Sequence, residues 1–210
     1  MIVSQGRKYI FVHIPKTGGT ALSLSLEARA KADDILIGDT PKAVKRRAKV
    51  KAWATDRKLR KHSTLADLHG LVDVDDFFVV TLVRNPWDRL VSYYFWLRDQ
   101  SFDHRAVELA KTHDFSGFLN HPETLMTLNA ESYSGYVSMP GSVVSPHYIR
   151  LEHLANDITP FEVHVGFKLD IPHVNRSDRA ADYRGYFSNE DAALVGRLYG
   201  DDAQRFGYQF

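Results

Sequence analysis

One stretch near the N-terminus constrains the fold more than any other, because it combines a strand pattern, a glycine loop and a helix pattern. Residues 9–14 read YIFVHI, a β-rich apolar run that predicts a buried strand. Residues 21–32 read ALSLSLEARAKA and predict a helix with Leu22 and Leu26 in its apolar stripe and Thr20 as its N-cap. A strand, a short loop and a helix in this order indicate an α/β domain.

The loop between these two elements has the composition of an anion-binding site. Gly18 and Gly19 let the backbone approach a ligand and turn its N–H groups inward, and the helix N-terminus adds a partial positive charge. Lys16 adds a full charge, and the hydroxyls of Thr17 and Thr20 can donate further hydrogen bonds. A tight surface turn is the alternative, but the strand before the loop and the helix after it favour an anion site.

A second apolar strand is followed directly by a positive charge. Residues 77–83 read FFVVTLV, as a central parallel strand would, and Arg84 comes next. Asn85 and Pro86 then predict a helix start, which places Ser92 about two turns into that helix. Ligands of open α/β sheets bind at the carboxyl ends of strands, so Arg84 and Ser92 predict a second anion site. Ser92 could instead face solvent or bond to a helix carbonyl.

The rest of the chain continues the alternation of strands and helices. We predict helices with loops over 102–146, a short strand over 148–151, a strand over 161–167 with a helix as the alternative, and a final helix opened by Ser188 and Asp191. The whole pattern predicts a three-layer α/β fold with a mainly parallel central sheet and a P-loop-like strand–loop–helix anion site. Residues 1–210 are predicted to form a single domain.

The bulk composition excludes several classes of protein. The chain has no cysteine, which excludes disulfides and thiolate metal sites. No apolar run approaches the roughly 18 residues needed to span a bilayer, and the N-terminus lacks the pattern of a signal peptide, so we expect a cytoplasmic enzyme. Its histidines and acidic residues show no metal-ligand spacing, and we predict no metal.

Positive charge is concentrated in one block of the sequence. Residues 42–61 hold ten Lys or Arg and one acid, Asp56, whereas the remainder holds seventeen basic and twenty-five acidic residues. Such a block can attract an anionic substrate or nucleic acid. A solvated helical face that touches no ligand is the other reading, and Trp53 is the only aromatic residue within the block.

The first loop differs from the phosphate loop of common nucleotide triphosphatases. A Walker A loop reads G-x-x-x-x-G-K-[ST], with the lysine after the glycines, whereas Lys16 stands before them. A magnesium-binding aspartate would be expected at the end of an apolar strand, where this chain has Arg84. Both observations argue against Mg-nucleotide chemistry and favour direct contact with an anion.

Two segments carry a resemblance to a known family. HIPKTGGTAL and LVRNPWDRLVSYY resemble the signature segments of sulfotransferases that use 3′-phosphoadenosine 5′-phosphosulfate (PAPS), closest to carbohydrate sulfotransferases and their small bacterial relatives. KHSTLADL, YIRLEHLANDI, HVNRS and DDAQRFGYQF extend the likeness, while the basic block is not part of it. The resemblance implies that Lys16, Thr17, Gly18, Gly19 and Thr20 hold the 5′-phosphosulfate and that Arg84 and Ser92 hold the 3′-phosphate.

The resemblance also implies a mechanism without a metal. Lys16 would stabilise the charge that develops on the bridging oxygen as adenosine 3′,5′-bisphosphate (PAP) leaves. A histidine suits the role of general base toward the acceptor hydroxyl, and His62 in the KHST segment is our choice. An ordinary surface histidine is the alternative for His62. His13 is the rival base, although its strand predicts a buried core residue, and His69 and His173 are further candidates.

A polar loop near the C-terminal end is implied to contact the nucleotide. Asn175, Arg176 and Ser177 could close over it, as the resemblance suggests. An Asx-type turn after Pro172 is the structural alternative.

The sequence therefore predicts a sulfotransferase that moves a sulfuryl group from PAPS to a hydroxyl, or alternatively an amine, of a saccharide or small metabolite. A nucleotide-dependent kinase of related P-loop fold and a non-catalytic nucleotide- or nucleic-acid-binding module are the competing hypotheses. An anionic acceptor would suit the basic block, but no motif identifies it.

Overall fold

The computed structural model describes residues 1–55, 57–129, 132–172 and 179–210. The chain divides into two compact units, of which the first contains Met1–Val83 and Tyr133–Val174 and the second contains Arg84–Ser132 and Asn175–Phe210. A single domain over residues 1–210 stays a prediction. Among the described residues, no helix combines the length and the apolar character needed to cross a membrane.

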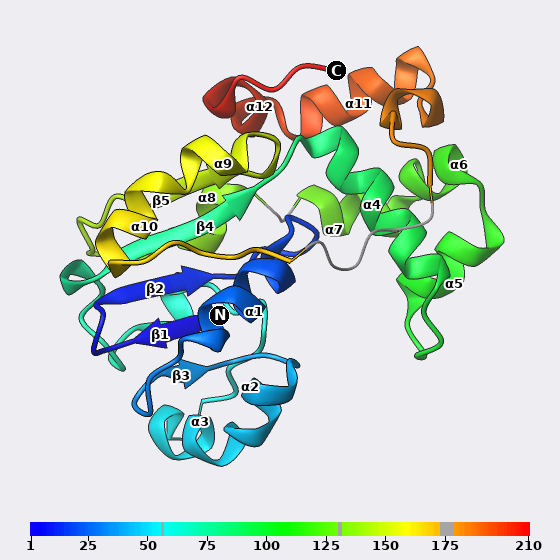
Figure 1. The fold of residues 1–210 in the computed structure, drawn as a ribbon. Coiled ribbons are helices and arrows are strands. Elements are labelled where there is room, and N and C mark those ends of the chain that lie inside the picture. The colour runs from blue at the N-terminus through cyan, green and yellow to red at the C-terminus, as the bar shows by residue number, and fades with distance from the viewer. Residues whose placement is uncertain (56, 130–131, 173–178) are drawn as a thin grey trace. The chain divides into compact units, whose positions relative to one another are not determined.

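The first unit is built on a five-stranded sheet in the order β3-β1-β2-β4-β5 (Figure 1). The strands are β1 (Ile2–Ser4), β2 (Tyr9–Val12), β3 (Ile35–Leu36), β4 (Phe78–Val83) and β5 (His147–Arg150). Three of them, β2, β4 and β5, run parallel, with Tyr9 opposite Phe78 and Val80 opposite His147. The predicted strands at 9–14, 77–83 and 148–151 are confirmed, as is the α/β class.

The predicted sheet was mainly parallel, but β1 pairs antiparallel with both β2 and β3. The reason is local, because the turn between β1 and β2 covers only residues 5–8 and includes Lys8 at a φ of 53°. A turn of that length can join only antiparallel neighbours, since a parallel pair needs a long crossover. The three-residue strand β1 carries too short a pattern to be recognised as a separate element.

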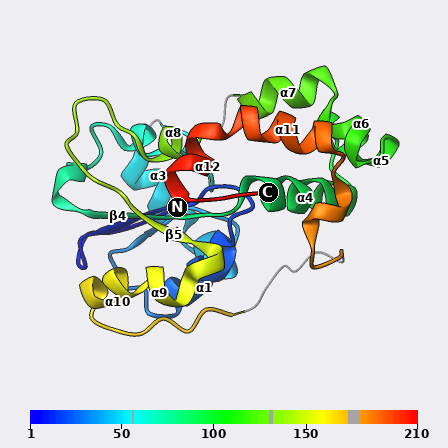
Figure 2. The ribbon, with the colours of Figure 1, turned by 90° about the horizontal axis from the view of Figure 1, so that it is seen from above.

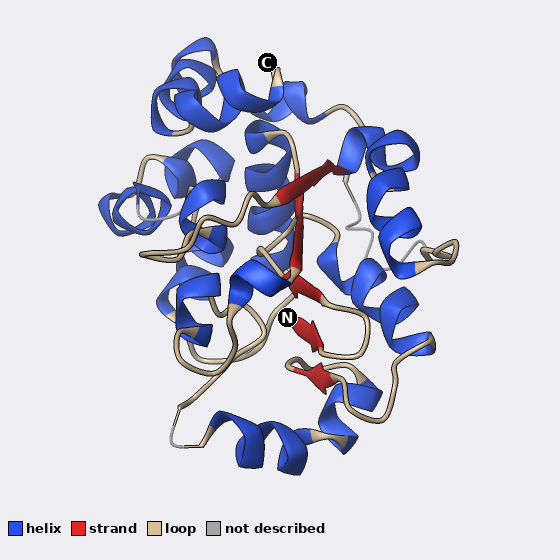
Figure 3. Ribbon diagram, turned by 90° about the vertical axis from the view of Figure 1, so that its left-hand side faces the viewer, coloured by secondary structure: helices blue, strands red, loops and turns tan. Residues whose placement is uncertain are grey.

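Helices cover both faces of this sheet, which gives the first unit its three layers (Figure 3). Tyr9 and Phe11 of β2 point into a core shared with α1 (Gly19–Ala28), α9 (Leu154–Asp157) and α10 (Thr159–Val165). Ile10 and Val12 point to the opposite core, which contains the 3₁₀ turns η1 (Leu65–Leu68) and η2 (Val74–Asp76) and helix α8 (Tyr133–Val137). Both faces of β2 are buried, as expected for a central strand.

The predicted strand over 161–167 is wrong, because this segment forms α10 and ends at Gly166 in the left-handed conformation. Its apolar residues alternate along the sequence, which resembles a strand. In the helix, Phe161 and Val165 are buried one turn apart, whereas Val163 is 76% exposed. Positions i and i+4 share a helix face, so alternation over few residues fits both periods.

The first part of the basic block lies in two short helices, α2 (Pro41–Lys45) and α3 (Arg47–Ala54), whereas residues 57–61 lie outside any helix. Thr40 caps α2 by accepting a hydrogen bond from the backbone N–H of Ala43 at 3.1 Å. The same hydroxyl donates to Glu27 at 2.6 Å and ties α2 to α1.

The second unit is helical and packs around α4 (Pro86–Arg98) (Figure 2). Its other elements are α5 (Arg105–Thr112), α6 (Phe115–Leu119), α7 (Pro122–Asn129), the 3₁₀ turn η4 (Tyr183–Tyr186), α11 (Asn189–Leu198) and α12 (Gly200–Phe206). Val91 and Tyr94 of α4 lie in one buried cluster with Phe118 of α6 and Val195 of α11. The prediction of helices and loops over 102–146 is confirmed for the described residues.

Both predicted helix starts in this unit are confirmed. The Asn85 side chain accepts from the backbone N–H groups of Trp87 at 3.1 Å and Asp88 at 3.4 Å, and Pro86 is the first helical residue. The Ser188 hydroxyl accepts from the N–H of Asp191 at 3.0 Å. Each cap satisfies a backbone donor that the helix itself leaves without a partner.

Candidate anion-binding site

The loop after β2 has the backbone geometry of an anion cradle. Lys16 and Gly18 have φ values of 65° and 87°, both in the left-handed region. Left-handed residues within such a turn direct successive N–H groups toward a common point. A left-handed conformation at a non-glycine residue costs about 1 kcal/mol or more, and Lys16 therefore marks a place where geometry is held against local preference.

The helix after the loop starts earlier than the sequence predicts. Gly18, not Thr20, is the N-cap of α1, and no side chain caps the first turn. Thr20 lies inside that turn because the left-handed turn at Gly18 already closes the loop. The first N–H groups of α1 therefore have no side-chain cap, so their positive end can act on an anion.

The two glycines are required by packing inside the protein. A Cβ on Gly19 would lie 2.3 Å from Cδ2 of His13, and a Cβ on Gly18 would lie 2.9 Å from Cδ1 of Leu151. The group that lies close to Gly19 is therefore the His13 ring, whereas the sequence analysis explained this glycine by the close approach of a ligand.

The two loop hydroxyls have different roles. Thr17 is fully buried, and its hydroxyl donates to the carbonyl of Ile14 at 2.9 Å. Its single hydroxyl hydrogen is donated within the fold in this structure, and donation to an anion stays a prediction. Thr20 accepts from Nζ of Lys61 at 3.3 Å. A hydroxyl that accepts in this way keeps its own hydrogen for an acceptor.

His62 lies beside this loop, although it is distant in sequence. Its Nδ1 is 2.8 Å from the carbonyl oxygen of His13, and the two rings meet edge to face with centroids 4.8 Å apart. His13 is 3% exposed, as predicted for a core histidine, whereas His62 keeps an exposed surface. The structure thus brings the glycine loop and His62 together in the first unit.

Both histidines are neutral at physiological pH. The pKa of His62 is lowered to about 4, mainly because its surroundings desolvate the charged ring; the nearby positive charge of Lys61 lowers it further, while the bond to the His13 carbonyl raises it. Burial also lowers the pKa of His13 well below its ordinary value. A carbonyl only accepts, so a neutral His62 carries its hydrogen on Nδ1 and leaves the lone pair on Nε2.

Arg84 begins the second unit and is held by an aspartate that sequence reasoning did not assign to the site. Its Nε and Nη2 atoms lie 2.8 and 2.7 Å from Oδ2 of Asp88. Arg179 binds the other oxygen of the same carboxylate and is 9% exposed. Ser92 is buried two turns along α4. The i, i+4 spacing of Arg84 and Asp88 is the sequence feature that could have predicted this ion pair.

Two predicted contacts cannot be placed. Asn175 and Ser177 lie outside the described residues. In the part of the chain that is described, no group of three or more histidine, aspartate or glutamate side chains could hold a metal ion.

Comparison with known proteins identifies the class. A family model described as "Sulfotransferase family" matches residues 1–140. Among solved structures, the crystal structure of mouse sulfotransferase SULT7A1 complexed with PAP is similar in fold, with a TM-score of 0.52 and 14% sequence identity over 94% of this chain and 85% of that one. No curated protein sequence matches significantly.

The chain therefore belongs to the sulfotransferase family. This confirms the predicted resemblance to PAPS-dependent sulfotransferases at the level of the family and the prediction that the protein is a transferase.

Proposed function

We propose that this protein transfers the sulfuryl group of PAPS to a hydroxyl, or alternatively an amine, of a saccharide or small metabolite. The observation that carries the proposal is the loop of residues 13–20, where Lys16 and Gly18 are left-handed and no side chain caps the N-terminus of the following helix. The 5′-phosphosulfate would bind to the backbone N–H groups of this loop, with Thr20 as a hydroxyl donor. A cytoplasmic location remains a prediction from the sequence.

The chemistry is an in-line displacement at sulfur. The acceptor oxygen forms a bond to sulfur while the bond from sulfur to the bridging oxygen breaks, and its electron pair stays on the 5′-phosphate of PAP. Lys16 would neutralise the charge that gathers on that bridging oxygen. His62 would take the acceptor proton on Nε2, since its Nδ1–H is held by the His13 carbonyl at 2.8 Å.

The 3′-phosphate would bind to Arg84 and Ser92. The carboxylate of Asp88 fixes the Arg84 guanidinium through two nitrogens at 2.8 and 2.7 Å. Because Asp88 also binds Arg179, two guanidinium groups share one negative charge. A guanidinium that a carboxylate holds in place is positioned to bind a phosphate through parallel hydrogen bonds, which supports the assignment of this cluster to the donor.

Ligand-dependent thermal stability tests the proposal. We expect PAP to raise the melting temperature of the protein, because at about 100 times its Kd a ligand adds about 2.7 kcal/mol to the free energy of unfolding. Arg84→Ala should weaken PAP binding, whereas Arg197→Ala on an exposed part of α11 is the matched control and should leave it unchanged.

Three outcomes would contradict this proposal. Stabilisation of the protein by ATP with magnesium but not by PAP would favour the competing hypothesis of a nucleotide-dependent kinase. Salt-sensitive binding of RNA or DNA without sulfuryl transfer from labelled PAPS to any acceptor would favour the nucleic-acid-binding module. Equal PAP affinity in Arg84→Ala and the wild type would remove Arg84 from the donor site.

A further inference from the structure

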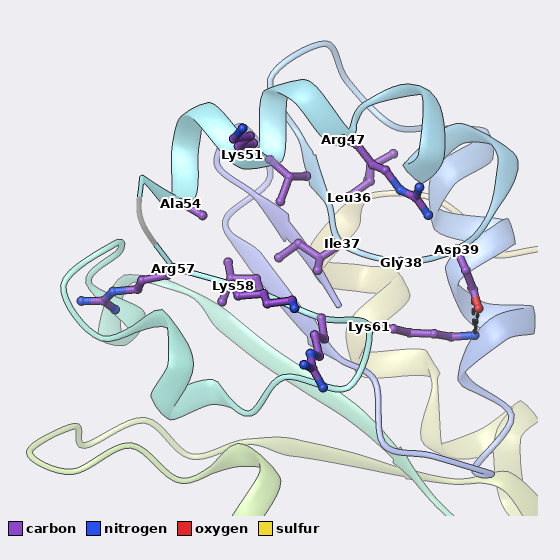
Figure 4. A pocket seen from close by; sticks show the side chains of 13 residues that line it. Leu36, Ile37, Gly38, Asp39, Arg47, Lys51, Ala54, Arg57, Lys58 and Lys61 are labelled. Carbon is purple, nitrogen blue, oxygen red and sulfur yellow. Dashed lines mark hydrogen bonds and ion pairs between the residues drawn. The ribbon is translucent and has the colours of Figure 1, made fainter. Parts of the chain in front are cut away.

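The basic block encloses a pocket that the donor does not need. The pocket has a volume of about 420 Å³ and lies between α3 and the segment 57–61, against β3 and the residues that follow it (Figure 4). Ligand pockets for small molecules begin at about 300 Å³. All of its lining residues lie in the first unit.

Its lining combines an apolar floor with a positively charged rim. Leu36 and Ala54 on the floor are each 1% exposed. Six lining residues are basic: Arg47, Lys51, Arg57, Lys58, Arg60 and Lys61. Among the described lining residues, Asp39 carries a carboxylate, and this carboxylate pairs with Lys61 at 2.9 Å. Asp56 lies outside the described residues.

The chain reverses direction so that both halves of the basic block face one cavity. Arg47 extends from α3 toward Gly38, while Lys58 and Lys61 come from the opposite wall (Figure 4). On a simple solvated helix, like charges would be spread over the surface, where their repulsion is smallest. Arg57 donates to the carbonyls of Asp67 and His69, and Lys61 pairs with Asp39. Arg47 and Lys58 come from opposite walls (Figure 4), and an anion between them would relieve their mutual repulsion. This arrangement favours a ligand site over a solvated face.

One wall of the pocket continues into the proposed transfer site. Nζ of Lys61 lies 3.3 Å from the Thr20 hydroxyl in the glycine loop and 2.9 Å from Asp39. The next residue, His62, contacts the carbonyl of His13. A molecule in the pocket would therefore be held beside the loop and beside the base.

We propose that this pocket binds the anionic part of the acceptor, so that the acceptor carries a carboxylate, sulfate or phosphate group in addition to the hydroxyl that receives the sulfuryl group. The apolar floor would contact the carbon skeleton, and the rim would bind the charge. The inference rests on the proposed function and names its class of substrate. It assigns the basic block, which the family resemblance does not include, to recognition of the acceptor.

A matched pair of charge-reversal variants tests this site. The pocket variant is Lys51→Glu with Lys58→Glu, two exposed lining residues. The control is Lys45→Glu with Arg197→Glu, two exposed residues outside the lining that change the net charge equally. The probes are glucose, glucuronate, glucose 6-sulfate and glucose 6-phosphate, which distinguish the three anionic groups. Their Kd is measured by calorimetry with and without PAP.

We expect at least one charged sugar to bind about tenfold or more tightly than glucose, and the pocket variant to lose that preference because charged contacts are removed and repulsion is introduced. The control should keep the preference, and the Kd of PAP should be unchanged in both variants. No preference for charged sugars, or equal loss in both variants, would overturn the inference. Failure of PAP to bind the wild type would instead overturn the proposed function, because sugar binding is also measured without PAP.

Discussion

At the scale of single residues, the proposed base is prepared by a backbone carbonyl. The His13 carbonyl accepts from Nδ1 of His62 at 2.8 Å, which directs the lone pair of the neutral ring to Nε2. A pKa lowered to about 4 keeps that lone pair available at neutral pH. The negative charges of a bound donor would raise this pKa and make Nε2 a stronger base.

His62→Asn tests the role of His62 as a base separately from its hydrogen bond to the His13 carbonyl. The asparagine amide can still donate to the His13 carbonyl, but it offers no nitrogen lone pair. We expect kcat to fall by about 10² to 10⁴, as for loss of a general base, while the Kd of PAP stays the same. Steady-state transfer from labelled PAPS and PAP calorimetry provide the two measurements.

His69→Asn is the control for this substitution, since His69 is an exposed histidine on the same stretch of chain. It should keep full activity. Full activity in His62→Asn would move the role of base to another residue, and a joint loss of activity and PAP affinity would indicate a structural role for His62.

At the scale of elements, the sequence predicts helix starts well when the cap is a side chain. Asn85 and Ser188 both cap as expected, because their short polar side chains reach the N–H groups that follow them. The start of α1 differs because the backbone at Gly18 provides the cap. Segment 161–167 differs because its alternation fits two periods, and contact with the sheet core selects the helix.

Asn85→Ala tests the cap of α4, the helix that carries Ser92. The Asn85 oxygen accepts from two N–H groups, and its amide donates to the carbonyl of Gln209 at 3.0 Å. We expect the free energy of unfolding to fall by about 1 kcal/mol, within a range of about 0.5–2 kcal/mol. Asn85→Asp keeps the acceptor and should recover most of this loss in urea unfolding. Equal losses in the two variants would show that the cap is not the source of the stability.

At the scale of the whole molecule, two histidines with lowered pKa values make stability depend on pH. His13 and His62 have pKa values lowered by desolvation, to about 4 for His62. Between an unfolded pKa of about 6.5 and these folded values, the unfolded chain binds more protons, so the free energy of unfolding falls as the pH falls. Glu27 opposes this trend, because burial raises its pKa.

We therefore expect the urea midpoint to be lower at pH 5 than at pH 7.5. His62→Asn removes one of the groups whose pKa folding lowers, which also include His13 and the amino group of Met1, and should show a smaller difference between these two pH values. The amino group of Met1, whose pKa burial lowers to about 5, adds to the same trend. Because it is present in both proteins, the difference between wild type and variant reports the contribution of His62. An equal difference in wild type and variant would contradict the assignment to His62.

The sequence by itself determined the strand–loop–helix order and the family. Local patterns are sufficient there, since the strand period, the glycines, Lys16 and the Asn85–Pro86 pair act on near neighbours. The same local reasoning placed Arg84 directly after a strand, where β4 ends at Val83.

Only the tertiary structure decided the contacts between distant positions. The His62–His13 bond spans 49 residues, and Arg179 meets Asp88 across 91. The Thr17 hydroxyl was turned into the fold, and the basic block was closed into a pocket beside the loop. No sequence period encodes such contacts, because they depend on how the sheet and its helices pack and therefore on side chains that lie far apart in the chain.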